Sequence, residues 1–333
     1  MRCFWDPRQL AHAPAIEMHN GRFDACAETP ARAQAILNAV GATELPRDHG
    51  EEAILRVHPQ AYVEFLKSAH SDWLAAGREG DALPYAFPVA RRREVNLDRI
   101  DARLGRYSYD TCTPISEGTW ASAYWNVQTA LSALDSVLDG NRSAFALCRP
   151  PGHHCGTDYM GGYCYLNSAA IAAEAAASGG KRVAILDIDY HHGNGTQDIF
   201  YARRDVFFAS IHADPATDYP FYWGHADEVG EGEGEGATLN LPLPRGTTLA
   251  EFDRALDQAL DGIAAFAPDL LILSYGADTF EGDPISHFSI ATADYPPIAR
   301  RISALGLPSL IVMEGGYAVD ALGANVAAFL SGF

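Results

Sequence analysis

The sequence has 333 residues, of which 48% are hydrophobic, and this length allows a large buried core. The formal net charge is −19 at pH 7, which disfavours a nucleic-acid partner and permits a positively charged ligand. No apolar run reaches the roughly 18 to 20 residues that span a bilayer, and the N-terminus lacks a signal-peptide pattern, so we expect a cytoplasmic protein with no membrane partner.

The N-terminal part of the chain shows three helical patterns, over residues 31–40, 60–76 and 120–139. Between the second and the third lies a segment with Pro and Arg residues and no strong periodicity, which predicts a long insertion loop at about 81–119. This insertion could be functional, could form an oligomer contact or could be a plain surface loop. No composition break or internal repeat marks a boundary, so we predict one domain over residues 1–333.

The rest of the chain alternates short apolar runs with amphipathic helices. Such runs predict parallel strands that are buried on both faces. A capping box from Thr248 to Glu251 marks the start of one of the helices. The prediction is therefore an α/β fold with helices on both faces of a parallel sheet. The predicted strands are residues 143–148, 182–187, 206–211, 270–275 and 309–314.

Four of these strands run directly into polar segments. Ligands of parallel sheets bind beyond the carboxyl ends of the strands, so we expect the four segments to meet at one pocket. The segments are RPPGHH (149–154), DIDYHHGNG (187–195), GADTFEGDP (276–284) and EGGY (314–317).

A metal site is the first chemistry that these segments predict. Asp187, Asp189 and His191 alternate along an extended segment and can share a face, and Asp278 follows a neighbouring strand. Carboxylate and imidazole ligands suit a catalytic zinc, and also Fe(II) or Mn(II). The alternative is that these residues are helix-capping carboxylates and hydrogen-bonded core histidines.

The remaining candidates are a histidine pair and a tyrosine. His153 and His154 follow a rigid turn and could be further ligands, or a general base with a differently tuned partner. Tyr317 follows two glycines and could donate a hydrogen bond to a developing oxyanion. Each of these residues could equally be structural.

These motifs, together with GGYCYLN (161–167), resemble in order and spacing the zinc-dependent deacetylases of the histone deacetylase superfamily. Within it, the sequence is most similar to the bacterial acetylpolyamine amidohydrolases, in its compact length and in segments such as FPVARR. The resemblance implies the arginase-deacetylase fold, a three-layer α/β/α arrangement around an eight-stranded parallel sheet. It also implies that the whole chain is one zinc-dependent deacetylase domain.

The resemblance assigns roles to the polar residues. It implies one zinc per chain, with Fe(II) as an alternative, bound by Asp189, His191 and Asp278. His153 and His154 would lie beside the attacking water, and Tyr317 would polarise the scissile carbonyl.

Two further residues would orient the histidine pair. Asp187 would orient His153, and Asn194 would hold His154. An amide stabilises an imidazolium less than a carboxylate does, so we expect His154 to titrate lower and to act as general base and acid. His192 has no role in this scheme and is interpreted as structural.

Substrate and ion contacts are also implied. Gly162 and Tyr163 would line a substrate tunnel, with an aromatic residue from the segment Phe221 to Trp223, foremost Phe221 or Tyr222, on the opposite wall. Arg32 corresponds to a residue of an acetate exit channel. A potassium ion would be held by Asp187, Asp189, His191, Ser210 and Ile211.

Substrate choice depends on carboxylates near the tunnel. Cys112 stands where a polyamine-reading glutamate is expected, and the substitutes are Glu17, which we favour, and Asp101, Asp110 and Glu117. The acidic segment 228–236 is interpreted as a solvated turn.

The predicted function is hydrolysis of acetylated amines, foremost acetylpolyamines, by a homodimer, giving acetate and free amine. The alternative is deacetylation of acetyl-lysine in proteins or of other small amides or esters. Metal-dependent binding without turnover would not require both Tyr317 and the histidine pair, and a binuclear manganese ureohydrolase would need further carboxylate ligands that the sequence does not supply.

Overall fold

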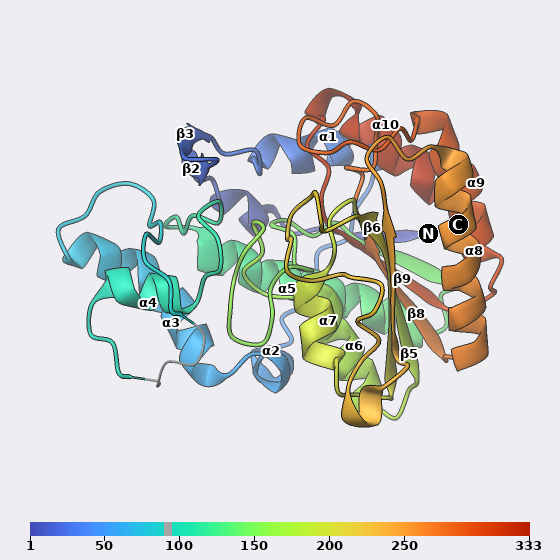
Figure 1. The fold of residues 1–333 in the computed structure, drawn as a ribbon, viewed down its shortest axis with the longest axis horizontal. Helices are drawn as coiled ribbons and strands as arrows, with labels where there is room; N and C mark the ends of the chain where they lie inside the picture. Colours follow the sequence, from blue (N-terminus) through green and yellow to red (C-terminus); the bar gives the residue numbers. More distant parts are fainter. Residues whose placement is uncertain (90–94) are drawn as a thin grey trace.

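A parallel sheet forms the centre of the structure, a computed structural model in which residues 1–89 and 95–333 are described (Figure 1). The five predicted strands are all present, and two further strands join them at the edges of the sheet. Because every pairing in the sheet is parallel, the carboxyl ends of all its strands lie at one edge. In spatial order the strands are β1 (Arg2–Phe4), β4 (Ser143–Ala146), β9 (Ser309–Met313), β8 (Leu270–Tyr275), β5 (Val183–Asp187), β6 (Val206–Ala213) and β7 (Thr238–Leu243).

The sheet has seven strands within the described residues, so the expected number of eight is corrected. On the outer side of β1 the chain makes one isolated parallel bridge, between Phe4 and Glu44. The Glu44 N–H donates to the Cys3 carbonyl at 2.8 Å, and the Trp5 N–H donates to the Glu44 carbonyl at 3.0 Å. The next donor of this ladder would be Pro46, which has no N–H, and the pairing therefore ends after one bridge.

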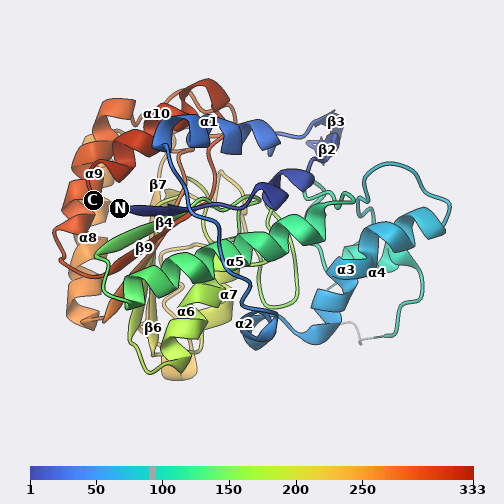
Figure 2. The same ribbon diagram turned by 180° about the vertical axis from the view of Figure 1, so that it is seen from behind.

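Helices cover both faces of the sheet, as the sequence predicts (Figures 1 and 2). Side chains alternate along β5, so that Ala184 and Leu186 pack in one core while Val183 and Ile185 pack in the other. The first core is closed by α1 (Pro30–Val40), α8 (Leu249–Phe266), α9 (Tyr295–Ser303) and α10 (Val319–Leu330). The second is closed mainly by α2 (Glu52–Val57), α3 (Gln60–Ala75), α5 (Thr119–Leu138) and α6 (Ser168–Ser178). The short helix α7 (Asn194–Phe200) follows the polar segment after β5.

The capping box at the start of α8 is present. The Thr248 N–H donates to Glu251 Oε2 at 2.8 Å, which satisfies a backbone group that the helix itself leaves unpaired. In the described residues no helix has the length and apolar character needed to cross a bilayer.

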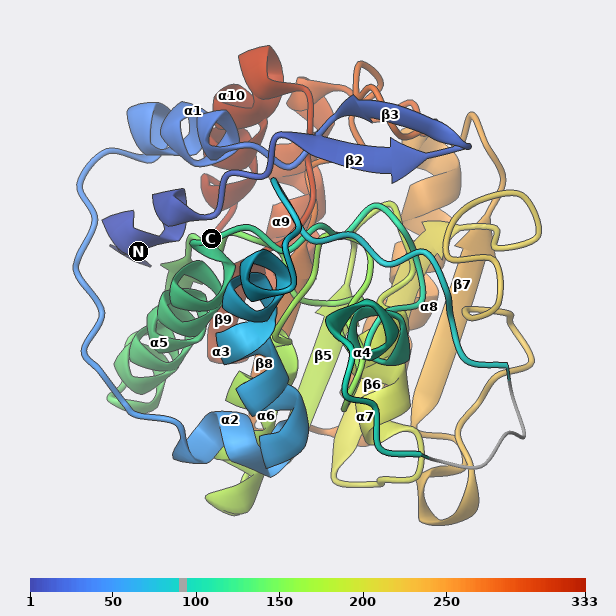
Figure 3. The same cartoon turned by 90° about the vertical axis from the view of Figure 1, so that its left-hand side faces the viewer.

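The insertion differs from the loop that the sequence predicts, because it contains a two-turn helix, α4 (Ile100–Arg106). Residues 90–94 of the predicted insertion lie outside the described residues. A hairpin of β2 (Ile16–His19) and β3 (Arg22–Ala25) lies on the same side of the molecule as the insertion (Figure 3). The Met18 N–H donates to the Thr111 carbonyl at 3.2 Å, which joins the hairpin to the C-terminal part of the insertion.

Candidate functional site

A cavity of about 510 Å³ opens at the carboxyl edge of the sheet. Each of the four polar segments contributes one lining residue, namely His154, His191, Pro284 and Tyr317, so the segments meet at one pocket as predicted. The hairpin and the insertion supply further residues of its rim. Among its lining residues are His154, His191, Tyr317, Gly162, Tyr163 and Asp110.

Asp189, His191 and Asp278 form a cluster in which one possible ligand atom of each residue lies within 4.8 Å of the others. The His191 Nδ1 atom is 3.1 Å from Asp278 Oδ2 and 3.4 Å from Asp189 Oδ1. Burial and the neighbouring Asp189 raise the pKa of Asp278 to about 7. Burial also acts to raise the pKa of Asp189, but His153 and His191 outweigh it and lower that pKa. Two buried carboxylates this close repel each other when both are ionised. A divalent cation between them would neutralise this negative charge.

Two glycines allow the backbone to approach these carboxylates. A Cβ atom at Gly276, directly after β8, would lie 2.0 Å from Asp189 Oδ2. A Cβ atom at Gly315, after β9, would lie 2.5 Å from Asp278 Oδ2, and the Gly315 N–H donates to Asp189 Oδ2 at 2.8 Å. The strand ends are thus shaped around the acidic cluster, and the donor set fits a zinc-class cation.

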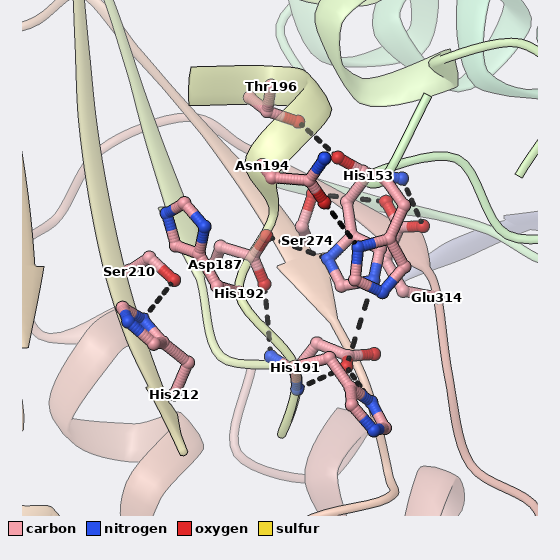
Figure 4. A network of polar contacts seen from close by, with 12 residues as sticks. His153, Asp187, His191, His192, Asn194, Thr196, Ser210, His212, Ser274 and Glu314 are labelled. Carbon is pink, nitrogen blue, oxygen red and sulfur yellow. Dashed lines mark hydrogen bonds and ion pairs between the residues drawn. The ribbon is translucent and has the colours of Figure 1, made fainter. Parts of the chain in front are cut away.

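The histidine pair lies beside this cluster, since His153 Nε2 is 3.8 Å from Asp189 Oδ1, and the two rings have different partners. Figure 4 labels His153 together with Asp187 and Asn194. His153 Nδ1 is 3.0 Å from Asp187 Oδ2, whereas His154 Nδ1 is 2.7 Å from Asn194 Oδ1. The amide oxygen of Asn194 is an acceptor, so the neutral His154 ring carries its proton on Nδ1 and has a free lone pair on Nε2.

The two histidines differ in pKa as the sequence leads us to expect. Burial would lower the pKa of His153, but Asp189 and Asp187 outweigh it and raise the pKa to about 10. Burial and the neighbouring His153 and His191 lower the pKa of His154 well below its usual value, and the bond to Asn194 opposes this only partly. A neutral His154 is suited to accept a proton.

Glu314 is a buried residue of this network whose role the sequence does not reveal (Figure 4). Its Oε2 accepts the N–H groups of Gly152 at 2.6 Å and His153 at 3.2 Å, and its Oε1 accepts the Ser274 hydroxyl at 3.1 Å. Burial raises the pKa of Glu314 to about 7. The residue fixes the turn that delivers the histidine pair. The sequence does contain a sign of this role, because Glu314 is an acidic residue directly after an apolar strand.

Tyr317 is held from three sides. Its N–H donates to Asp283 Oδ2 at 2.6 Å, its ring centre is 5.6 Å from that of Tyr163, and the Arg32 guanidinium carbon lies 4.7 Å from its ring centre. Arg32 is itself buried and ion-paired with Glu28 at 2.8 Å. These contacts fix the Tyr317 ring at the cavity wall.

Tyr219 is an aromatic residue of the cavity wall that the sequence does not predict. The Tyr219 ring lines the cavity with its centre 5.1 Å from that of His154. Phe221 also lines the cavity, at half exposure, as expected. Tyr222 does not line it and is 82% exposed, so its expected contact with substrate is corrected. The turn geometry of residues 217–224 decides which aromatic faces inward, and the sequence does not reveal that geometry.

The four candidate carboxylates occupy different surroundings. Glu17, the favoured one, is buried outside the lining residues and accepts the Tyr163 hydroxyl at 3.0 Å. Asp101 is ion-paired with Arg78 and Arg99, and Glu117 lines a different hollow.

Asp110 lines the cavity itself, and its Oδ2 accepts the Gly162 N–H at 2.6 Å. Among the residues that the structure describes, no Lys or Arg forms an ion pair with Asp110. Cys112 lines the same cavity.

Two remaining expectations concern residues around β6. Asp187 pairs in register with Ser210, which brings two of the expected potassium ligands together, and Ile211 is the next residue of that strand. The Ser210 hydroxyl is 2.8 Å from His212 Nδ1. His192 is buried with its Nε2 3.1 Å from Gln197 Oε1, as a structural residue would be.

The acidic segment 228–236 is only partly the solvated turn that we expect. Its first residue, Glu228, accepts the Gly224 N–H at 3.0 Å and a hydrogen bond from Gln197. This anchor ties the segment to the loop that carries Tyr219.

Comparison with known proteins decides the family. Residues 19–333 match the model of the histone deacetylase domain. The chain belongs to the histone deacetylase family. The predicted metal-dependent deacetylase, a hydrolase, is thereby confirmed, and the acidic cluster is the place for its metal.

Several relatives of this deacetylase are similar over nearly their whole length. Acetylpolyamine amidohydrolase 2 of Pseudomonas aeruginosa is 51% identical, covering 98% of this chain and 97% of its own. The acetylpolyamine amidohydrolase of Mycoplana ramosa is 46% identical, covering 99% and 98%. The crystal structure of acetylpolyamine aminohydrolase from Burkholderia pseudomallei superposes with a TM-score of 0.96 at 41% identity, covering 100% and 98%, which confirms the predicted fold class.

Proposed function

We propose that this deacetylase removes acetyl groups from acetylpolyamines and gives acetate and free amine. The observation that carries the proposal is that His191 of the acidic cluster, His154 of the histidine pair and Asp110 line one cavity. The similarity to acetylpolyamine amidohydrolases over nearly the full chain supports the same substrate class.

We propose zinc as the metal, with Asp189, His191 and Asp278 as its ligands and Fe(II) as the alternative. The ligand set of two carboxylates and one imidazole suits both ions. When bound, such a cation would polarise the acetyl carbonyl and make water a stronger nucleophile near neutral pH.

The residues of the chain then have distinct tasks. His154 accepts a proton from the attacking water at Nε2, while Asn194 holds its Nδ1–H. The Tyr317 hydroxyl donates to the carbonyl oxygen as that oxygen becomes negative. When the C–N bond breaks, a protonated histidine of the pair gives its proton to the departing nitrogen, so that acetate and a free amine leave.

Asp110 is the carboxylate that we propose for reading the ammonium group of the substrate, in place of the glutamate expected at Cys112. Asp110→Asn keeps an acceptor for the Gly162 N–H and removes the charge. We expect it to raise KM for acetylputrescine about tenfold or more, because an ammonium–carboxylate bond is worth more than a neutral one. KM for N-butylacetamide, which has no ammonium group, should not rise.

Glu117→Gln is the matched control, since Glu117 lies in the insertion but outside the cavity. If Asp110→Asn left KM for acetylputrescine unchanged, Asp110 would not be the reader.

The substrate assignment is tested by comparing kcat/KM for acetylputrescine, acetylspermidine and an acetyl-lysine peptide. We expect both polyamines to exceed the peptide. A higher value for the peptide would instead support the alternative, a deacetylase of acetyl-lysine in proteins.

Three further expectations stay predictions. We propose a potassium ion near Asp187, Asp189, His191, Ser210 and Ile211, for which activity in KCl should exceed activity in NaCl. We propose a homodimer, which light scattering would show, and a cytoplasmic location, which cell fractionation would show.

A further inference from the structure

The insertion is connected to the general base by a chain of hydrogen bonds. Tyr219 donates to Asp110 Oδ2 at 2.8 Å and also contacts the Tyr109 hydroxyl. Tyr109 in turn donates to Asn194 Oδ1 at 3.3 Å, the same oxygen that faces His154 Nδ1 at 2.7 Å.

Each of the two hydroxyls carries one proton. The Tyr219 proton is shared between Asp110 Oδ2 and the Tyr109 oxygen, and the Tyr109 hydroxyl donates to Asn194 Oδ1. With two donors on its Oδ1, the Asn194 side chain is fixed in the orientation that keeps the Nδ1–H of His154 in place.

Packing brings the same groups together independently of the hydrogen bonds. A Cβ atom at Gly161 would lie 2.1 Å from the Tyr109 ring, and one at Gly162 would lie 2.1 Å from the His154 ring. The two glycines thus let the backbone lie against both rings. The Tyr109 N–H also donates to the Met160 carbonyl at 3.3 Å, which fastens the insertion to this segment.

We propose that Tyr109 and Tyr219 are positioning residues, which hold Asn194 and through it His154 in the orientation needed for proton transfer. This inference rests on the proposed function, in which His154 is the general base. It makes the insertion a part of the catalytic apparatus rather than a rim alone.

Tyr109→Phe removes one hydroxyl and keeps the ring. We expect kcat to fall about tenfold, with KM within twofold of the wild-type value, because the base loses orientation while the substrate contacts remain. Metal content by elemental analysis should be unchanged. Tyr85→Phe is the matched control, since Tyr85 lies in the same insertion, is 71% exposed, and should leave kcat unchanged.

The double variant Tyr109→Phe/Tyr219→Phe tests whether the Tyr219 hydroxyl acts through Tyr109 or whether the two hydroxyls act independently. Because the Tyr219 hydroxyl acts on Asn194 only through Tyr109, we expect kcat of the double variant to be no lower than that of Tyr109→Phe. Multiplied kcat losses in the double variant, an unchanged kcat in Tyr109→Phe, or an effect on KM alone would overturn the proposal.

The assay uses whichever acetylated amine the wild-type protein hydrolyses fastest. An error in the proposed polyamine substrate therefore leaves this test intact, and the absence of any amide hydrolysis would count against the proposed function rather than against this inference.

Discussion

Replacing Tyr317 by Phe is expected to lower kcat by about a hundredfold or more, while the metal content stays at the wild-type level. Only a hydroxyl is lost, and the contacts that fix the ring, with Tyr163 and Arg32, are made by its aromatic part. A hydrogen bond to a developing oxyanion is made mainly in the transition state, so its loss falls on kcat rather than on KM. Steady-state kinetics with metal-loaded protein measures kcat and KM separately and so checks this prediction.

The exposed Tyr85→Phe serves as control for the substitution itself. If Tyr317→Phe retained the wild-type kcat, its hydroxyl would not be the oxyanion donor, and the carbonyl would have to be polarised by other groups of the cavity.

Asp278→Ala should abolish activity through loss of the metal. Asp278 is one of the three proposed ligands, and the remaining Asp189 and His191 would leave an incomplete site for a cation that prefers four ligands. Elemental analysis after purification is expected to find little bound metal.

Asp261→Ala on the exposed side of α8 is the matched control and should keep both metal and activity. Full metal occupancy in Asp278→Ala would contradict the ligand assignment.

The sequence predicts the metal cluster well because the cluster depends only on strand geometry and on the pairing of two neighbouring strands. Asp189 and His191 are two residues apart in an extended segment, and Asp278 follows the strand that pairs with β5. Period-two alternation and the common edge of parallel strands are enough to bring these three side chains together.

The parts that the sequence does not predict depend on contacts between distant segments. Tyr219 rather than Tyr222 faces the cavity because of the fold of a loop, and Glu314 contacts a turn 162 residues away in sequence. Asp101 and Asp110 look alike in the sequence, but two arginines neutralise the first and the cavity exposes the second. In the part of the chain that the structure describes, the expected eighth strand does not form beside β1, because Pro46 has no N–H to continue the pairing beyond the single bridge at Glu44.

The central claim, metal-dependent hydrolysis of an acetylated polyamine, is tested most directly by following acetate release from acetylputrescine. We expect the zinc-loaded protein to release acetate and putrescine in equal amounts, a chelated sample to release neither, and added zinc to restore release. Binding of acetylputrescine by the zinc-loaded protein without acetate release would contradict the claim.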